Sequence, residues 1–443
     1  MKLTFVASST TIVSHKNTKV LTDPWIIGKP FFGSWSHYPP IENKPDLINS
    51  VQYIYISHVH ADHADEETLR MIDNKIPIII YNFDSPGLKN RLESYGKTVL
   101  TLNHGEEFHC GDGLYIKIFI ADDCNPEICH RHFGCGKMET KFRSSTIDTM
   151  AVFYNENETI LNTNDCPFSL SEKTISRILE SHPKIDLLLT GYSGAGAYPQ
   201  CYEHYSDEDK LHLHGDRYRK LNLDNGGNFI KSVNPINYMP FAGTYTLAGK
   251  ASRLEKFKGV HTVEYALEHF KKNYAGHGFL LNSWETFDIS SGTQTKPYIE
   301  VNYNDREKYI EDVLSKVIYT YEKNPEPTLK EISELIPGAF NRFDKKRKEL
   351  EFSSNTCVYI YLPENKMIRL PFNGEMYQII DEEQFDKKNY VTYRLDSKLL
   401  LLILKGPKYA HWNYCEGGNH IMFSRDPDIY QRAVSYCMNY FHN

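Results

Sequence analysis

The sequence lacks an apolar run long enough to cross a membrane. A transmembrane helix needs about 18 or more consecutive apolar residues, whereas the longest apolar run here extends only from Leu399 to Leu404. The first residues, MKLTFVASSTTIV, also lack the charged region, apolar block and cleavage site of a signal peptide. We therefore predict no membrane span and no secretion signal.

Basic charge and a disulfide framework are missing as well. The net charge of −7 argues against a non-specific nucleic-acid surface, because contacts with phosphates need a net basic face. Nine cysteines are an odd number without compact spacing, which predicts free thiols in a reducing cytoplasm instead of disulfides. We expect a cytoplasmic protein that binds no nucleic acid.

The length of the chain indicates more than one domain. A chain of 443 residues is too long for one ordinary hydrophobic core, and its 40% apolar residues can fill two. We predict a catalytic domain at residues 1–294 and a second domain of the α+β class at residues 295–443. In the first domain, apolar strands alternate with short helical segments, which is typical of an α/β fold.

The clearest chemical signal is a string of four metal-binding side chains that follows an apolar strand, Val51 to Ser57. Alternate residues of an extended segment point the same way, so His58 and His60 can face one ion. Where the chain turns into a helix, Asp62 and His63 can hold a second ion. Imidazole suits zinc, iron or manganese, and a carboxylate beside it suits a hard ion that carries water. A solvated helix start with Asp62 as the N-cap is the alternative, which we disfavour.

This HxHxDH string resembles the metallo-β-lactamase superfamily. The resemblance implies an αββα sandwich with two metal ions at one edge. It also implies roles for two aspartates: Asp23 in the TDP turn would orient a metal-bound histidine, and Asp165 in LNTNDC would bridge the ions. Each could instead be an ordinary turn aspartate. Asp62 and Asp23 are the candidate catalytic residues.

The sequence departs from the superfamily pattern at the third metal-binding histidine, which normally follows a strand in this region. The matching place contains Asp122 and Asp123, with His130 and His132 further on. We take Asp123 as the candidate ligand, although any of the four could serve. A thiolate cluster is an alternative, but its spacing matches no zinc knuckle, so we expect these cysteines to be buried and unliganded: Cys124, Cys129 and Cys135.

A second departure narrows the resemblance. Hydrolases of the superfamily place a histidine where Phe241 and Ala242 stand here, so the second ion lacks its usual last ligand. Together with TDPW, LNTNDC, YSGAGAYPQCY and MPFAGTY, the region from residue 1 to about 290 resembles the branch that includes CMP-N-acetylneuraminate hydroxylase. That branch implies an O2-dependent monooxygenase fed by a Rieske iron-sulfur domain. No pair of CxH and CxxH motifs occurs here, so either a separate protein supplies electrons or the chemistry differs.

Two further segments contain candidate substrate residues. The glycine-rich loop after residue 190 includes Tyr192, Ser193 and Tyr198, and its backbone N–H groups could approach a phosphate or carboxylate. A tight loop needs glycines in any case. The segment 410–430 resembles the tail of bacterial proteins of the same branch, whose domain is similar to sterol-carrier modules. His411 in this tail could line a cleft between domains, although a packed tail is the favoured interpretation.

Several local predictions bear on the fold. Lys2 to Val13 and Lys19 to Thr22 are expected to form a hairpin, and Leu399 to Leu404 a strand. Apolar residues at helical spacing predict an amphipathic helix over 305–323. A capping box at Thr328 predicts a helix that ends at Pro337. A charged surface helix is expected from Ser206 to Lys220, with two solvated histidines, His212 and His214. We expect the following aromatic residues to pack their loop, although they could wall a pocket: Phe31, Phe32, Trp35 and Tyr38.

Two main functions follow. In the favoured one, a binuclear non-haem iron centre activates O2 and hydroxylates a sugar-like or nucleotide-linked small substrate. In the other, zinc or manganese activates water to hydrolyse a phosphoester, lactone or amide. A degenerate binding module is a third, disfavoured class. The expected ligands are His58, His60, Asp62, His63, Asp123 and Asp165.

Overall fold

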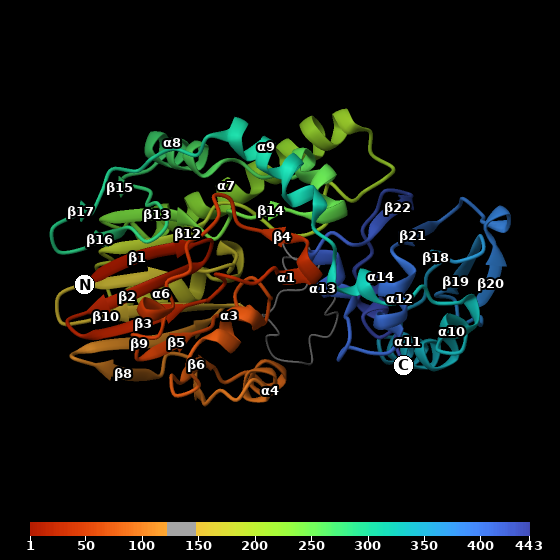
Figure 1. Cartoon of the computed structure of the whole chain (residues 1–443), viewed down its shortest axis with the longest axis horizontal. Coiled ribbons are helices and arrows are strands. Elements are labelled where there is room, and N and C mark those ends of the chain that lie inside the picture. The colour runs from red at the N-terminus through yellow and green to blue at the C-terminus, as the bar shows by residue number, and fades with distance from the viewer. Residues whose placement is uncertain (122–147) are drawn as a thin grey trace.

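Two β-sheets pack face to face in the part of the chain that precedes residue 295 (Figure 1). This computed structural model describes residues 1–121 and 148–443. The first sheet has the order β17-β16-β1-β2-β3-β5-β6-β7, and its strands pair in parallel from β3 to β7. Its strands are β1 (Lys2–Ala7), β2 (Thr10–His15), β3 (Thr18–Thr22), β5 (Tyr53–Tyr55), β6 (Ile78–Tyr81), β7 (Val99–Leu102), β16 (Thr286–Asp288) and β17 (Thr293–Gln294).

The second sheet is also mixed. Its order is β15-β13-β12-β11-β10-β9-β8, with parallel pairing from β11 to β15. Its strands are β8 (Glu107–Gly111), β9 (Leu114–Ile120), β10 (Thr149–Tyr154), β11 (Thr159–Asn162), β12 (Leu187–Gly191), β13 (Asn237–Phe241) and β15 (His277–Gly278). The parallel strands of both sheets thus point their carboxyl ends toward loops at one edge, where ligands usually bind in α/β folds.

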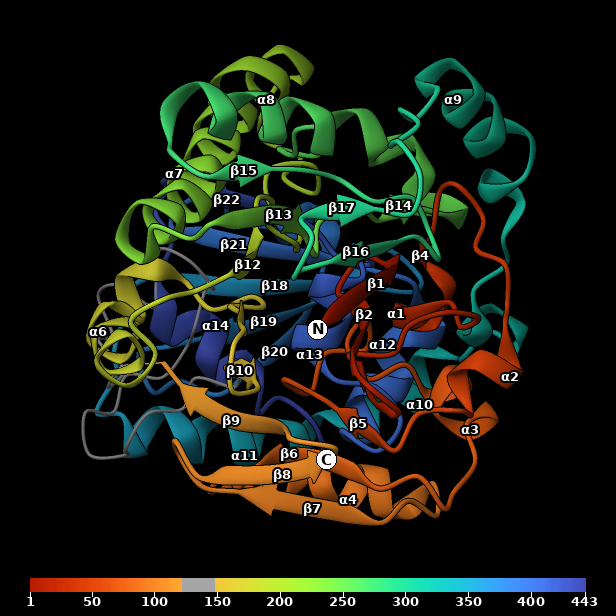
Figure 2. The ribbon, with the colours of Figure 1, turned by 90° about the vertical axis from the view of Figure 1, so that its left-hand side faces the viewer.

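Alternation along the strands creates three apolar layers. Along β11, Ile160 points into the core between the sheets, whereas Leu161 points to the layer under the helices. Two groups of helices cover the outer faces, on opposite sides of the paired sheets (Figure 2). They are α2 (Pro45–Ile48), α3 (Glu66–Met71) and α4 (Gly87–Ser94) on one side, and α6 (Glu172–Ser181), α7 (Gly215–Val233) and α8 (Val263–Asn273) on the other. This is the αββα sandwich, so the predicted fold class is confirmed.

The predicted first hairpin is a three-stranded meander. The chain turns at Ser8, whose φ is +47°, so β1 and β2 are separate antiparallel strands. The apolar and β-branched run from residue 2 to 13 gave no local signal for this turn, because a serine with positive φ is uncommon.

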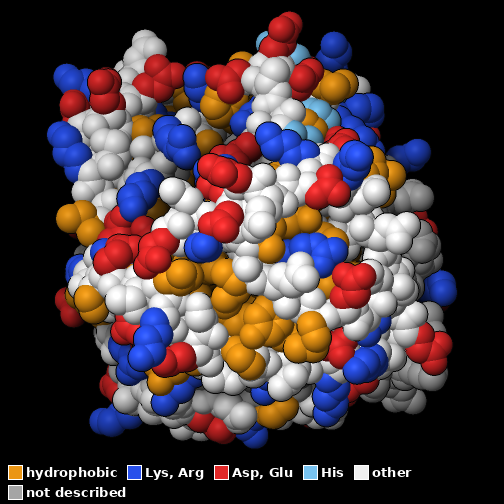
Figure 3. Space-filling view, turned by 90° about the vertical axis from the view of Figure 1, so that its right-hand side faces the viewer, with side chains coloured by type: hydrophobic (Ala, Val, Ile, Leu, Met, Phe, Trp, Pro, Cys, Tyr) orange, Lys and Arg blue, Asp and Glu red, His pale blue; other side chains and the backbone are white. Residues whose placement is uncertain are grey.

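Residues 303–438 contain a further set of helices and a sheet with the order β20-β19-β18-β21-β22. The strands are β18 (Cys357–Leu362), β19 (Lys366–Pro371), β20 (Gln378–Asp381), β21 (Tyr390–Arg394) and β22 (Met422–Asp426). The helices are α9 (Tyr303–Asp312), α10 (Leu329–Ser333), α11 (Ile336–Glu349), α12 (Ser397–Leu404), α13 (Trp412–Gly417) and α14 (Arg432–Met438). This is the predicted α+β arrangement, and its outer face gathers apolar side chains among charged ones (Figure 3). The domain boundary at 294 stays a prediction.

Three local predictions for this part were wrong. The run from Leu399 to Leu404 belongs to helix α12, whose N-cap is Asp396. It was predicted as a strand because six apolar residues in a row carry no periodicity that distinguishes a helix from a strand. Pro337 lies in the first turn of α11, a position that tolerates proline, so it begins a helix instead of ending one. Helix α9 is shorter than predicted and buries none of its residues. The capping box at Thr328 is confirmed.

The aromatic loop after TDPW joins the two parts of the molecule. It contains α1 (Pro30–Gly33) and β4 (Trp35–Ser36), which pairs with β14 (Thr246–Leu247). Phe31 and Trp35 are buried in the same hydrophobic cluster as Phe343 and Leu400 of the carboxy-terminal part. The backbone of residue 203 also donates to the carbonyl of Phe423, at 2.7 Å, beside strand β22. The expected packing is confirmed for Phe31, Phe32 and Trp35, which pack against the carboxy-terminal part. Tyr38 is half-buried, and its ring lies 5.4 Å from that of Tyr309. No helix of the described residues is long and apolar enough to span a membrane.

Candidate metal centre

The loop that follows β5 delivers the predicted ligands to the edge of the sandwich. His58 and His63 are buried, whereas His60 is half-buried. The next helix, α3, is capped by Asp65, whose side chain accepts from the backbone N–H of Thr68 at 2.8 Å. The alternative that Asp62 is the N-cap is therefore wrong, and its carboxylate is free for other contacts.

A first group of donors forms around His58. Its Nε2 lies 2.8 Å from Nδ1 of His60, 3.5 Å from Oδ1 of Asp148 and 3.9 Å from Oδ2 of Asp165. One ligand atom from each of His58, His60 and Asp165 lies within 4.8 Å of the others. A single ion placed between them could contact all three.

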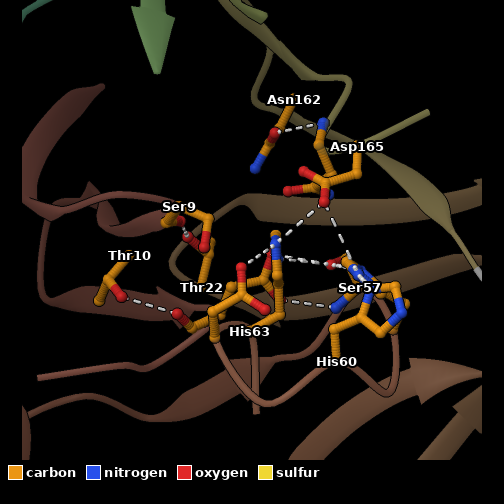
Figure 4. Close-up of polar contacts among 12 residues, drawn as sticks. Ser9, Thr10, Thr22, Ser57, His60, His63, Asn162 and Asp165 are labelled. Atoms are coloured by element: carbon orange, nitrogen blue, oxygen red, sulfur yellow. Dashed lines mark hydrogen bonds and ion pairs between the residues drawn. The ribbon is translucent and has the colours of Figure 1, made fainter. Parts of the chain in front are cut away.

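A second group forms around His63. Its Nε2 lies 3.4 Å from Oδ2 of Asp62 and 3.4 Å from Oδ2 of Asp165 (Figure 4). The same Asp165 oxygen thus faces both groups. This is the position that a bridging carboxylate requires.

The buried carboxylate of Asp23 holds the loop that follows β5. It accepts from the backbone N–H of Ser57 at 2.7 Å and from the Ser57 hydroxyl at 2.8 Å. Its Oδ2 also lies 2.9 Å from Nδ1 of His63, so Nε2 of that ring points toward Asp62 and Asp165. Such partners orient metal-binding histidines in many proteins.

The electrostatics of the two groups differ. Burial lowers the pKa of His58 well below its ordinary value and that of His60 to about 4, so both imidazoles are neutral at neutral pH. Burial raises the pKa of Asp62 to about 6. Burial alone would lower the pKa of His63, but the three carboxylates around it outweigh burial and raise that pKa well above its ordinary value. A concentration of carboxylates that holds a histidine protonated is a place where a metal cation would be stabilised.

The carboxylate of Asp148 was missed by sequence reasoning. It is 3% exposed, stands directly before β10 and contacts His58. Asp123, the candidate ligand predicted from the sequence, lies outside the described residues, as do Asp122, His130 and His132. The three cysteines at 124, 129 and 135 lie outside them too.

At the end of β13, Phe241 and Ala242 stand where hydrolases of the superfamily have a metal-binding histidine. Phe241 is 2% exposed and packs in the core between the sheets, so it supplies no ligand. Ala242 has a φ of +57°, and its backbone N–H donates to the carbonyl of Ser8 at 3.1 Å. Within the described residues, the second group therefore has Asp62, His63 and Asp165 as its donors.

The four candidate substrate residues make their own contacts in the structure. Tyr192 is 2% exposed and packs in the layer under the helices, so it is a core residue. Ser193 donates to the carbonyl of Gly243, and Tyr198 shares a hydrogen bond of 2.7 Å with Nδ1 of His214. His411 begins α13 and accepts from the backbone N–H of residue 413. Among the described residues, none of the four has a hydrogen bond or ion pair with the metal donors.

His214 corrects another prediction. The segment Asp209–His214 is a π-helix that leads into α7. His212 is exposed, as expected, but the ring of His214 is half-buried and stacks on Tyr205 with centroids 3.7 Å apart. The two histidines share one helical segment, but only one of them is solvated.

Two other side chains near the donors were not predicted. Burial, with a smaller contribution from the charge of Asp165, raises the pKa of Tyr218 to about 12, and its hydroxyl donates to the carbonyl of Ala195 at 3.2 Å. Arg91 on α4 donates through Nη2 to the carbonyl of Ala64, at 3.4 Å, and its Nε is buried without a partner among the described residues. Neither residue belongs to a motif, so a single sequence gives no reason to select them.

The donor set fits metal ions. Neutral imidazoles and carboxylates are the donors that iron, zinc and manganese accept, and the ligand atoms of the first group converge within 4.8 Å. The fold and this cluster together define an α/β sandwich of the metallo-β-lactamase type with a histidine and carboxylate centre at one edge.

Comparison with known proteins narrows the class. No family model matches the chain. It is 26% identical over 265 residues to cytidine monophosphate-N-acetylneuraminic acid hydroxylase of Danio rerio, a match that covers 57% of this chain and 40% of the relative. It is 25% identical over 251 residues to a Mycolicibacterium smegmatis protein described as a Rieske 2Fe-2S iron-sulfur protein, covering 55% of this chain and 43% of the relative. These matches confirm the resemblance to the hydroxylase branch, and the chain spans less than half the length of these relatives.

A comparison with solved structures finds a weaker similarity. CmlA, a diiron beta-hydroxylase from Streptomyces venezuelae, superimposes with a TM-score of 0.42 and 17% identity, over 64% of this chain and 53% of that chain. A likeness at this level says nothing about the reaction.

Proposed function

We propose that this chain is a metal-dependent monooxygenase that holds two divalent metal ions, with iron as the native metal. Its substrate would be a small, sugar-like or nucleotide-linked molecule. The similarity to CMP-N-acetylneuraminic acid hydroxylases carries this proposal. The carboxylate-rich donor set supports it, because oxygen donors beside imidazole suit non-haem iron.

The residues divide between two ions. His58, His60 and Asp148 would hold the first ion, and Asp62 and His63 the second, with Asp165 between them. Bound iron would supply the activation of O2. With two electrons and two protons from the donor, that reaction would insert one oxygen atom into a C–H bond of the substrate and release the other as water.

The chain itself orients the metal ligands and excludes bulk water from them. Asp23 holds the ring of His63 with Nε2 toward the centre, and burial of His58 and His63 keeps bulk water from these ligands. The electrons would come from a donor outside these 443 residues, such as an iron-sulfur protein, because no pair of CxH and CxxH motifs is present to bind a Rieske cluster.

Metal content tests this function directly. We expect protein purified without added metal to contain about two iron ions per chain, measured by elemental analysis, and to consume O2 when given a chemical reductant and substrate. Zinc or manganese at the same stoichiometry, without O2 consumption, would contradict the oxygenase. It would instead favour the hydrolase of a phosphoester, lactone or amide.

Arg91 indicates an anionic group on the substrate. Its guanidinium lies beside the metal loop and lacks a carboxylate partner among the described residues. Two divalent ions would neutralise the negative charges of four carboxylates, those of Asp23, Asp62, Asp148 and Asp165. The positive charge of Arg91 would then have no counter-charge among them. An arginine with free donors is suited to a carboxylate or phosphate.

We expect Arg91→Gln to weaken binding of CMP-N-acetylneuraminic acid by about tenfold or more, because a charge-assisted hydrogen bond is lost. Calorimetric titration of the metal-loaded protein measures this effect. Arg70→Gln is the matched control, since Arg70 is exposed and already bound to Glu66 at 2.8 Å. Equal affinity in the wild type and in Arg91→Gln would remove Arg91 from the substrate site.

A further inference from the structure

Two buried polar atoms beside the second donor group have no hydrogen-bond partner among the described residues. They are Nδ2 of Asn162 and Oγ of Ser9. Asn162 is 1% exposed and Ser9 is fully buried. Folded proteins pair almost all of their buried polar groups, so each such atom needs an explanation.

Asn162 is held so that its amide donor faces the space between the sheets. It is the last residue of β11, where side chains alternate between the inner and the outer layer. Ile160 lies in the core between the sheets, so Asn162, two residues on, points the same way. Its Oδ1 accepts from the backbone N–H of Asn164 at 3.0 Å, which leaves Nδ2 pointing toward the centre (Figure 4).

Ser9 approaches from the turn between β1 and β2. Its carbonyl accepts from the Thr22 hydroxyl at 3.3 Å, and the Thr10 hydroxyl donates to the carbonyl of Asp23 at 2.7 Å. The turn is thus fixed against the residue that holds His63. In Figure 4, Ser9 and Asn162 lie on the side of His63 away from Ser57.

Among the described residues, the second group has few protein donors. Asp62, His63 and Asp165 provide three, whereas zinc takes at least four ligands and iron commonly more. With these described donors alone, an ion held there would have an open coordination position.

We propose that Ser9 and Asn162 hydrogen-bond a small oxygen or nitrogen ligand, such as water or a small anion, at the open side of the second ion. This inference rests on the proposed metal centre. The Asn162 amide nitrogen can only donate, so the ligand atom must be an acceptor, whereas the Ser9 hydroxyl can donate or accept. These are positioning residues that act on a ligand of the ion, and neither is a ligand of the ion itself.

Azide binding to the cobalt(II)-loaded protein tests this proposal, because azide is a small acceptor anion and the visible absorption of cobalt reports its coordination. We expect Asn162→Leu and Ser9→Ala to load cobalt as the wild type does but to bind azide about tenfold more weakly, the loss of one hydrogen bond. Thr190→Val is the matched control. The Thr190 hydroxyl is also buried without a partner among the described residues. Thr190 lies two residues after Leu188 on β12, so its side chain points, like that of Leu188, to the layer under the helices.

Thermal unfolding of the metal-free variants separates positioning from a structural role. Since Oγ of Ser9 has no hydrogen-bond partner among the described residues, Ser9→Ala should leave the Tm of the metal-free protein unchanged or higher. Asn162→Leu also removes the Oδ1 acceptor of the Asn164 N–H, so its metal-free Tm should fall, and its azide affinity is compared at equal cobalt loading. Unchanged azide affinity in both variants with normal cobalt loading would overturn the inference alone. A wild-type protein that takes up no cobalt would overturn the proposed metal centre, and the inference with it.

Discussion

Asp165→Ala is expected to remove metal from both donor groups, a larger loss than other single substitutions at this centre would cause. Its Oδ2 lies 3.9 Å from Nε2 of His58 and 3.4 Å from Nε2 of His63, so one carboxylate serves both groups. Its removal also leaves the three imidazoles with less negative charge to offset the charge of two cations. Elemental analysis after dialysis should show most of the metal gone.

Comparison with two other variants makes this test specific. His60→Ala should lose metal mainly from the first group, because His60 contacts His58 and not His63. Asp224→Ala should keep the wild-type content, since Asp224 is an exposed residue paired with Lys220 on a surface helix. Asp165→Ala protein with full metal content would show that this carboxylate does not bridge the groups.

The centre could be predicted from the sequence only where its residues form a local pattern. His58, His60, Asp62 and His63 fall within six positions after a strand, so their spacing alone indicated that they share one site. Asp148 contacts His58 from 90 positions away, and only the pairing of β9, β10 and β11 brings it there. A single aspartate before a strand carries no such signal.

The same limit applies to the fold. The capping box at Thr328 could be predicted because Thr328 and Glu331 form a local pattern. The run from Leu399 to Leu404 was assigned to a strand because apolar residues in a row fit either element. Its helical state is set by the Asp396 cap and by the core around Leu400, which is a tertiary effect.

That core is the basis of the last expected result. Phe343→Ala should destabilise the protein by about 3–5 kcal/mol, the usual cost of removing a large buried side chain and leaving a cavity. Phe343 is fully buried on α11 and contacts the rings of Phe340, Phe372 and Phe441. Urea unfolding followed by tryptophan fluorescence measures the change.

The position of the tryptophans makes this measurement informative about the whole molecule. Trp25 and Trp35 lie beside the metal loop, whereas Trp412 lies in the carboxy-terminal part, yet all three belong to the same hydrophobic cluster as Phe343. We therefore expect the fluorescence and the circular dichroism of Phe343→Ala to shift together in one transition. Ile379→Ala, at a side chain 39% exposed on β20, should change stability by less than about 0.5 kcal/mol. Two separate transitions in the Phe343 variant would mean that the shared cluster does not couple the two parts, and that the boundary near residue 294 divides units that unfold independently.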